Sequence, residues 1–129
     1  DVAGAIAACD PTNAIDMLMG TGGSTEAVLA AAPVKIMGGE LLCRFVPPDD
    51  KHREKVRTAG ITDLAKIYRA EDLAKGRQLT FTATGIIQGP LLDGVIFKKN
   101  QIITHSMVLR GTSGTMRYIT THHDAYAAP

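Results

Sequence analysis

Apolar and polar residues follow one another in two different ways along the chain. Up to about residue 78, helical spacing alternates with short apolar runs bounded by Gly, Pro or Asp. This pattern predicts helices over residues 2–9, 26–37, 51–58 and 70–75, strands over 15–19 and 41–46, and a helical turn over 61–68. The remaining chain is rich in Val, Ile, Thr and Phe, which predicts strands over 79–86, 94–98, 102–110 and 115–121. KKNQ, residues 98–101, lies between two of these strands and predicts a hairpin.

Alternating helices and strands followed by a β-rich end are typical of a layered α/β domain. We therefore expect one domain over residues 1–129, with a mixed β-sheet and flanking helices, and a loose tail at 125–129. A hydrophobic content of 45% in 129 residues is enough for a real core. Pro33 lies inside the second predicted helix and should kink or shorten it, because proline lacks the backbone donor.

Charge and cysteine content exclude several classes of protein. The 14 basic and 13 acidic residues nearly cancel, which argues against a general nucleic-acid or membrane-surface partner. No apolar run reaches the length of a membrane span. Cys9 and Cys43 are isolated from each other and from His clusters, which favours free thiols in a reducing cytoplasm.

The strongest functional signal lies in residues 15–36, IDMLMGTGGSTEAVLAAAPVKI. An apolar strand, a glycine turn and a helix N-terminus form an arrangement that can bind phosphate. We expect the glycines to adopt positive φ, and Ser24 or Thr25 to cap a helix that carries Glu26 in its first turn. The alternative is that the glycines only turn the chain and Glu26 only complements the helix dipole. The stretch lacks the Lys-Ser/Thr of a Walker A loop and the G-x-G-x-x-G spacing.

Other polar residues carry weaker signals. Arg110 and Arg117 flank TSG and could face an anion, although exposed strand-end arginines are the more ordinary interpretation. We interpret His105 as a structural histidine in a strand and His52 as a surface residue. His122 and His123 should point to opposite sides of a strand, which disfavours joint metal binding.

Three blocks of the sequence resemble one known family. They are MGTGGSTEAVLAAAPVKIMGGELLCRF (19–45), FTATGIIQGPLLDGVIF (81–97) and THSMVLRGTSGTMRYI (104–119). In order and spacing they are similar to class II fructose-1,6-bisphosphatases, which belong to the lithium-sensitive, metal-dependent sugar phosphatases. The opening DVAGAI resembles the family's Asp-Gly-Asp-Val-Ala segment. The family's Asp-Pro-Ile-Asp-Gly-Thr motif is missing here, so the resemblance implies the C-terminal portion of a longer enzyme whose N-terminal half is absent.

The resemblance also assigns roles to individual residues. Glu26 matches a glutamate that binds the metal, Gly23 a glycine whose backbone meets the substrate, and Asp1 an acid of the substrate-binding segment. The implied cofactors are Mg²⁺ or Mn²⁺ ions, with catalytic groups supplied by the absent half. This sequence has Thr25 where the family has proline and Ala27 where it has glycine, so the local geometry should differ.

The function that the resemblance implies is cytoplasmic hydrolysis of fructose 1,6-bisphosphate to fructose 6-phosphate and phosphate, in gluconeogenesis. Sedoheptulose 1,7-bisphosphate is an alternative substrate, and a homo-oligomer is the expected assembly. The chain alone should be inactive, because a single metal-binding carboxylate is too few. Two alternatives stay open: a non-catalytic sugar-phosphate-binding or oligomerisation module, and another lithium-sensitive enzyme such as an inositol phosphatase. The second and third blocks argue against the latter.

Overall fold

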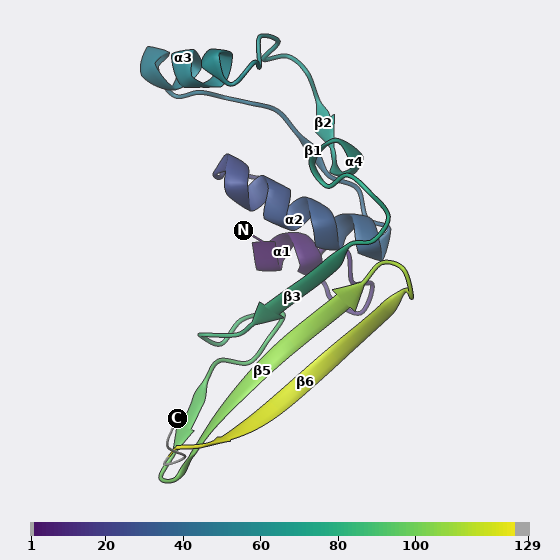
Figure 1. Ribbon diagram of the computed structural model, residues 1–129, viewed down its shortest axis with the longest axis vertical. Helices are drawn as coiled ribbons and strands as arrows, with labels where there is room; N and C mark the ends of the chain where they lie inside the picture. The colour runs from purple at the N-terminus through teal and green to yellow at the C-terminus, as the bar shows by residue number, and fades with distance from the viewer. Residues whose placement is uncertain (1, 126–129) are drawn as a thin grey trace.

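The computed structural model describes residues 2–125, which form an elongated, curved molecule (Figure 1). The helices are α1 (Val2–Ala7), α2 (Ser24–Met37), α3 (Asp50–Thr58) and α4 (Ala70–Leu73). The strands are β1 (Leu42–Cys43), β2 (Tyr68–Arg69), β3 (Thr80–Thr84), β4 (Ile96–Lys98), β5 (Gln101–Arg110) and β6 (Thr115–Asp124). The helices and the first two strands occupy one end of the curve, and the larger sheet forms the other.

Two antiparallel sheets replace the predicted mixed sheet, so that prediction was wrong. β1 pairs with β2, while β5 pairs with β3 and β4 along one edge and with β6 along the other. The predicted hairpin is confirmed, since Lys98 lies opposite Gln101. The strands of the larger sheet are joined without a helical crossover, and parallel neighbours would need one.

The helix α2 is the centre of the packing. It contacts α1 and α4 and lies against β3 and β5. One buried cluster joins Ile6 of α1 to Met107 and Leu109 of β5. A second cluster joins Ala31 of α2 to Ala70 and Ala74, where three small side chains let the two helices approach closely. The four predicted strands of the last third are confirmed as β3 to β6, and β5 carries the buried residues of the larger sheet, Ile103, Met107 and Leu109.

Pro33 does not shorten α2, contrary to the prediction. The helix continues to Met37 and ends where predicted, at Gly38, which adopts the left-handed conformation with φ 75°. The Gly39 N–H then donates to the Val34 carbonyl at 2.9 Å. Pro33 is fully buried, so packing of its ring offsets the backbone hydrogen bond that it cannot make.

The predicted strand over residues 15–19 does not form. These residues have no regular secondary structure and pair with no other described segment, and Met17 and Met19 are 70% and 83% exposed. An apolar, extended segment becomes a strand only when a neighbouring strand accepts its backbone hydrogen bonds. The predicted strand over 41–46 is likewise reduced to the two residues of β1, and Tyr68 of the predicted turn lies in β2.

The charged helix α3 is confirmed as a solvated element. Asp49 is its N-cap and accepts from the His52 backbone N–H at 2.8 Å. His52 is a surface residue, as predicted, with its ring 2.7 Å from the same carboxylate. None of the α3 residues is buried.

The exposed surface is large for a chain of this mass. It measures 9111 Å², whereas a compact protein of 13.7 kDa exposes about 6,600 Å². The additional area includes many large apolar side chains on residues 15–19, on the N-terminal half of α2 and on β6. The structure contains no helix in its described part that is long and apolar enough to cross a membrane.

Candidate functional site

The residues predicted to bind phosphate and metal lie at the N-terminal end of α2. The N-cap is Gly23, with φ −73° and ψ 153°, and no side chain caps the helix. The predicted Ser24 or Thr25 cap was therefore wrong, because the helix starts one residue earlier. The predicted positive φ at the three glycines was wrong as well. The chain enters the helix extended, so it needs no left-handed residue there.

Glu26 is in the first turn of α2, as predicted. Its carboxylate is partly exposed, and Oε2 accepts a hydrogen bond from the Thr25 hydroxyl at 2.8 Å. This hydrogen bond, together with one from its own backbone N–H, holds the pKa of the Glu26 carboxyl below its ordinary value. The carboxylate is consequently ionised at neutral pH.

Gly23 and Glu26 are in direct contact. The Glu26 side chain folds back over the N-cap, and a Cβ added to Gly23 would overlap Glu26 Oε2. By contrast, a Cβ added to Gly20 would meet nothing within 4 Å. The absence of a side chain at position 23 thus allows the carboxylate to lie beside the unpaired N–H groups of the first turn.

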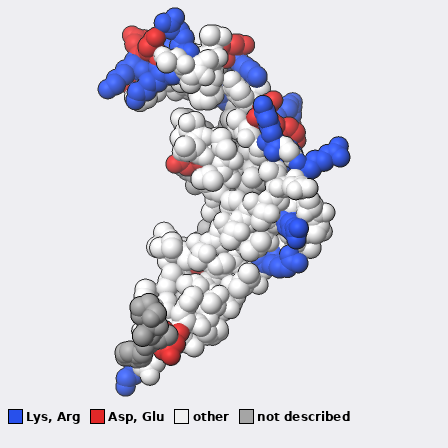
Figure 2. All heavy atoms as spheres, in the orientation of Figure 1, with Lys and Arg blue, Asp and Glu red and all other residues white. Residues whose placement is uncertain are grey.

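This end of α2 faces the open, concave side of the molecule (Figure 1). Figure 2 shows that most of the concave side is uncharged, whereas Lys and Arg gather on α3 and along the convex side. Within the described residues no three His, Cys, Asp or Glu side chains come together as a metal site. Asp1, the other predicted substrate-binding residue, lies outside the described residues. Of the residues predicted to bind metal or substrate, the described chain therefore presents one carboxylate, that of Glu26, at this end of α2.

The remaining candidates are exposed and lie elsewhere. Arg110 donates to the Thr112 hydroxyl at 3.2 Å, and Arg117 to the Thr115 hydroxyl at 2.8 Å, at the turn between β5 and β6. His122 and His123 point to opposite faces of β6, as predicted, since they pair with the successive residues Ile103 and Ile102.

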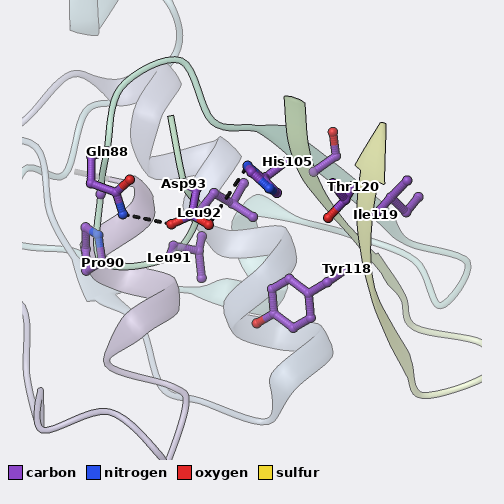
Figure 3. A pocket seen from close by; sticks show the side chains of 11 residues that line it. Gln88, Pro90, Leu91, Leu92, Asp93, His105, Tyr118, Ile119 and Thr120 are labelled. Carbon is purple, nitrogen blue, oxygen red and sulfur yellow. Dashed lines mark hydrogen bonds and ion pairs between the residues drawn. The ribbon is translucent and has the colours of Figure 1, made fainter. Parts of the chain in front are cut away.

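A hollow on another part of the molecule was not predicted from the sequence. It has a volume of about 420 Å³ and lies between the loop Gln88–Asp93 and the strands β5 and β6 (Figure 3). Asp93 accepts from the Gln88 amide at 2.8 Å, and its other oxygen lies 3.9 Å from His105 Nδ1. That nitrogen is buried without a hydrogen-bond partner in the described structure. The only sequence signal was an Asp after a Gly- and Pro-containing turn, which is too common to indicate a site.

The hollow and the end of α2 have different chemistry. The hollow is lined by no Lys or Arg, so it offers no positive charge to a phosphate. The end of α2 offers backbone N–H groups and a carboxylate, which together suit a phosphate and the cation that accompanies it. The α2 end is thus the better candidate for the site that the sequence predicts.

Comparison with known proteins gives a consistent result over nearly the whole chain. The family described as bacterial fructose-1,6-bisphosphatase, glpX-encoded, matches residues 1–123. A class 2 fructose-1,6-bisphosphatase of Haemophilus influenzae is 36% identical over 95% of the chain. Fructose-1,6-bisphosphatase 1 class 2 of Escherichia coli strain K12 is 34% identical over the same share. The chain spans about 40% of the length of these curated relatives.

Proposed function

The chain belongs to the family of bacterial, glpX-encoded fructose-1,6-bisphosphatases, and from this premise we propose that it contributes one wall of a sugar-phosphatase active site. The reaction is hydrolysis of the 1-phosphate of fructose 1,6-bisphosphate to fructose 6-phosphate and phosphate. As part of this proposal, the reaction belongs to gluconeogenesis and takes place in the cytoplasm. Sedoheptulose 1,7-bisphosphate is an alternative substrate that would undergo the same hydrolysis.

The observation that carries the proposal is the ionised Glu26 carboxylate on an open helix N-terminus. Carboxylate oxygens are the ligands that Mg²⁺ and Mn²⁺ prefer, and Glu26 is both charged and accessible. It therefore fits as one ligand, although the described residues do not supply a full set. When bound, such an ion neutralises phosphate charge and lowers the pKa of a water molecule. We place its other ligands in the part of the relatives' length that this chain does not span.

Gly23 and the first turn of α2 would hold the substrate. The N-cap residue makes no side-chain hydrogen bond, and the Glu26 N–H binds its own carboxylate, so the other first N–H groups would be available to phosphate oxygens, and the helix dipole favours the negative charge. At Gly23 no Cβ covers the backbone, but the Glu26 carboxylate lies in that space, so this carboxylate would turn towards its metal ion as the phosphate approaches. The role of Asp1 as a further substrate-binding residue rests on the resemblance of its segment alone.

Exposed apolar residues flank this end of α2 on both sides. Ile15, Met17, Leu18 and Met19 precede Gly23, and Val28 and Leu29 follow Glu26. Exposed apolar patches of this extent are typical of interaction surfaces. We propose that the rest of a longer polypeptide packs here, pairs with residues 15–19 as a strand, and closes the active site around Glu26.

The test is a longer protein that contains this chain, with Glu26→Gln as the variant. The amide keeps the size of the side chain but loses the charge that binds the metal. Changes in the outer shell of a metal site cost up to about 100-fold in activity, so loss of a direct ligand should lower turnover by at least that factor. Release of phosphate from fructose 1,6-bisphosphate is measured with saturating Mn²⁺.

Glu71→Gln is the matched control, because Glu71 also lies in the first turn of a helix, α4. It should leave turnover unchanged. The 129-residue chain alone should release no phosphate. A Glu26→Gln enzyme that keeps most of its rate would make Glu26 a helix-dipole carboxylate only. If the longer protein binds the substrate but never hydrolyses it, the alternative of a non-catalytic sugar-phosphate-binding module holds instead.

A further inference from the structure

The hollow beside β5 and β6 has a closely fitted wall, the loop Gln88–Asp93. Within this loop the Gly89 N–H donates to the Leu92 carbonyl at 3.1 Å, which closes a tight turn. A Cβ added at Gly85 or at Gly94 would overlap the backbone of the loop, so both glycines let neighbouring segments approach closely. Leu91 and Leu92 also pack against the buried cluster that joins α1 to β5. The wall is therefore held by its own backbone and by the core.

The charge on the Asp93 carboxylate has no cationic partner in the hollow. Among the described residues, no Lys or Arg lines this space. Asp93 Oδ1 accepts from the Gln88 amide at 2.8 Å, whereas Oδ2 lies 3.9 Å from His105 Nδ1, too far for a hydrogen bond (Figure 3). The Asp93 side chain is 59% exposed, so a ligand that enters the hollow can reach it. One carboxylate oxygen is thus open to a donor from outside the described chain.

An aromatic ring lies on the other side of the hollow. In the register of β5 and β6, His105 is opposite Thr120, and Met107 is opposite Tyr118. His105 and Tyr118 are therefore diagonal neighbours on one face of the sheet. Tyr118 is 58% exposed, and its ring points from β6 towards the loop (Figure 3). The face of a tyrosine ring attracts cations, so the ring and the carboxylate favour the same kind of ligand.

We propose that this hollow binds an organic cation that carries a guanidinium or primary ammonium group. The cation donates to Asp93 Oδ2, lies against the Tyr118 ring and compensates the charge of the carboxylate. The volume of about 420 Å³ suits a small ligand. An anion would be repelled by Asp93, and a neutral alcohol would leave its charge uncompensated. Two sources have the required chemistry: a free small molecule, or a Lys or Arg side chain from the rest of a longer polypeptide.

The first test uses the 129-residue chain and agmatine, which has a guanidinium at one end of a four-carbon chain and an ammonium at the other. Titration followed by the backbone amide signals of Gly89 and Gly94 should give a dissociation constant of about 1 mM or lower. Asp93→Asn keeps the size of the side chain but removes its charge. It should raise the constant by about tenfold or more, because hydrogen bonds to charged groups are the strong ones. Tyr118→Leu should raise it by about threefold.

The matched control is Asp63→Asn, because Asp63 is also an exposed loop aspartate with one hydrogen bond, from the Ala65 N–H. It should bind agmatine like the unaltered chain, and circular dichroism of all variants should be unchanged. The uncharged probe 1,4-butanediol should leave the amide signals in place. The proposal would be overturned by a chain that binds no agmatine up to about 10 mM, by normal binding to the Asp93→Asn variant, or by equal binding of the diol.

The second test separates the two sources, and it measures binding and stability rather than phosphate release, so it does not depend on the proposed function. A longer protein that binds agmatine through Asp93 takes a free cation. A longer protein that does not bind agmatine, but loses Tm on Asp93→Asn and not on Asp63→Asn, fills the hollow with its own Lys or Arg side chain. If agmatine does not bind and Asp93→Asn leaves Tm unchanged, the hollow is no cation site in that protein and the proposal is wrong.

Discussion

The two ends of α2 differ in almost every respect. At the C-terminal end, Gly38 closes the helix in the left-handed conformation, and the Lys35 ammonium donates to the carbonyls of Ala74 and Gly76 at 2.8 and 3.0 Å. Val34 is buried there. At the N-terminal end, no side chain caps the helix, and Val28 and Leu29 are exposed. The same helix is therefore anchored at one end and open at the other.

If the open end is the active-site wall proposed above, this difference separates the part of α2 that stabilises the fold from the part that carries the chemistry. The anchored end is fixed by packing against α4 and the sheet, so it sets the direction in which α2 points. The open end then carries Glu26 and its unpaired N–H groups on a rigid element without covering them. A site built on a helix is held more precisely than one on a loop. If this account is right, substitutions at the two ends should affect different properties.

The largest expected effect concerns stability at the anchored end. Val34→Ala removes two methyl groups from a side chain that is 2% exposed, and should lower the free energy of unfolding by about 2 kcal/mol. Val28→Ala makes the same change on the same helix at a side chain that is 46% exposed, and it should change the free energy of unfolding by less than about 0.5 kcal/mol. Urea unfolding of the 129-residue chain measures both.

The variants Val34→Ala and Val28→Ala also test the proposal that the rest of a longer polypeptide packs against the open end of α2. In a longer protein that covers the open end, Val28→Ala should become destabilising, whereas the cost of Val34→Ala should stay the same. Equal costs for the two variants in the 129-residue chain would remove the contrast between the ends.

The next effect concerns substrate binding at the open end. Gly23→Ala places a methyl group against Glu26 Oε2, so the carboxylate must move away. Gly23 already has a negative φ, and the clashing atom ends a flexible side chain, so the folded state should lose little stability. In a longer protein, we expect KM for fructose 1,6-bisphosphate to rise by about tenfold, which corresponds to about 1.4 kcal/mol, with Tm nearly unchanged.

Gly20→Ala is the control for this variant, because a Cβ at that position has open space and the backbone is not left-handed. It should leave KM unaltered. A Gly23→Ala protein with normal KM would exclude Gly23 from the substrate site, and a large fall in Tm would show that the glycine is needed for the turn.

The smallest effect concerns the ionisation of Glu26. The hydrogen bond from the Thr25 hydroxyl is the largest cause of the lowered pKa of Glu26, so Thr25→Val should raise this pKa towards its ordinary value. A carboxyl group whose pKa is lowered on folding stabilises the protein above its unfolded pKa, and this contribution is lost as the pH falls through the folded pKa. The variant should therefore lose less stability on acidification below about pH 4.5. Carbon-13 NMR titration of the Glu26 carboxyl follows the shift directly, and an unchanged pKa would contradict the assigned cause.

The sequence predicted local features better than contacts between distant segments. Gly38 and the acidic cap of α3 could be located because caps and left-handed glycines act within a few residues. The strands of the last third were predicted because β-branched runs and turns mark them. The apolar run over 15–19 was wrongly assigned to a strand, since the sequence cannot show whether a neighbouring strand is present.

The candidate site was predicted in part for the same reason. Glu26 in the first helical turn follows from local spacing and is confirmed in the structure. The identity of the cap and the contact between Gly23 and Glu26 depend on how the chain enters the helix, which composition does not determine. The hollow beside His105 depends on a loop packed against two strands, so it has no signal in the sequence pattern.

Metal binding at the open end of α2 is the central claim, and equilibrium dialysis with Mn²⁺ tests it most directly. A longer protein that contains this chain is compared with its Glu26→Gln variant, with Glu71→Gln as control and folding checked by Tm. We expect the Glu26→Gln protein to bind fewer Mn²⁺ ions per chain than the unaltered protein, or to bind one of them at least about 100-fold more weakly. The same number of ions bound with the same affinity would contradict the account.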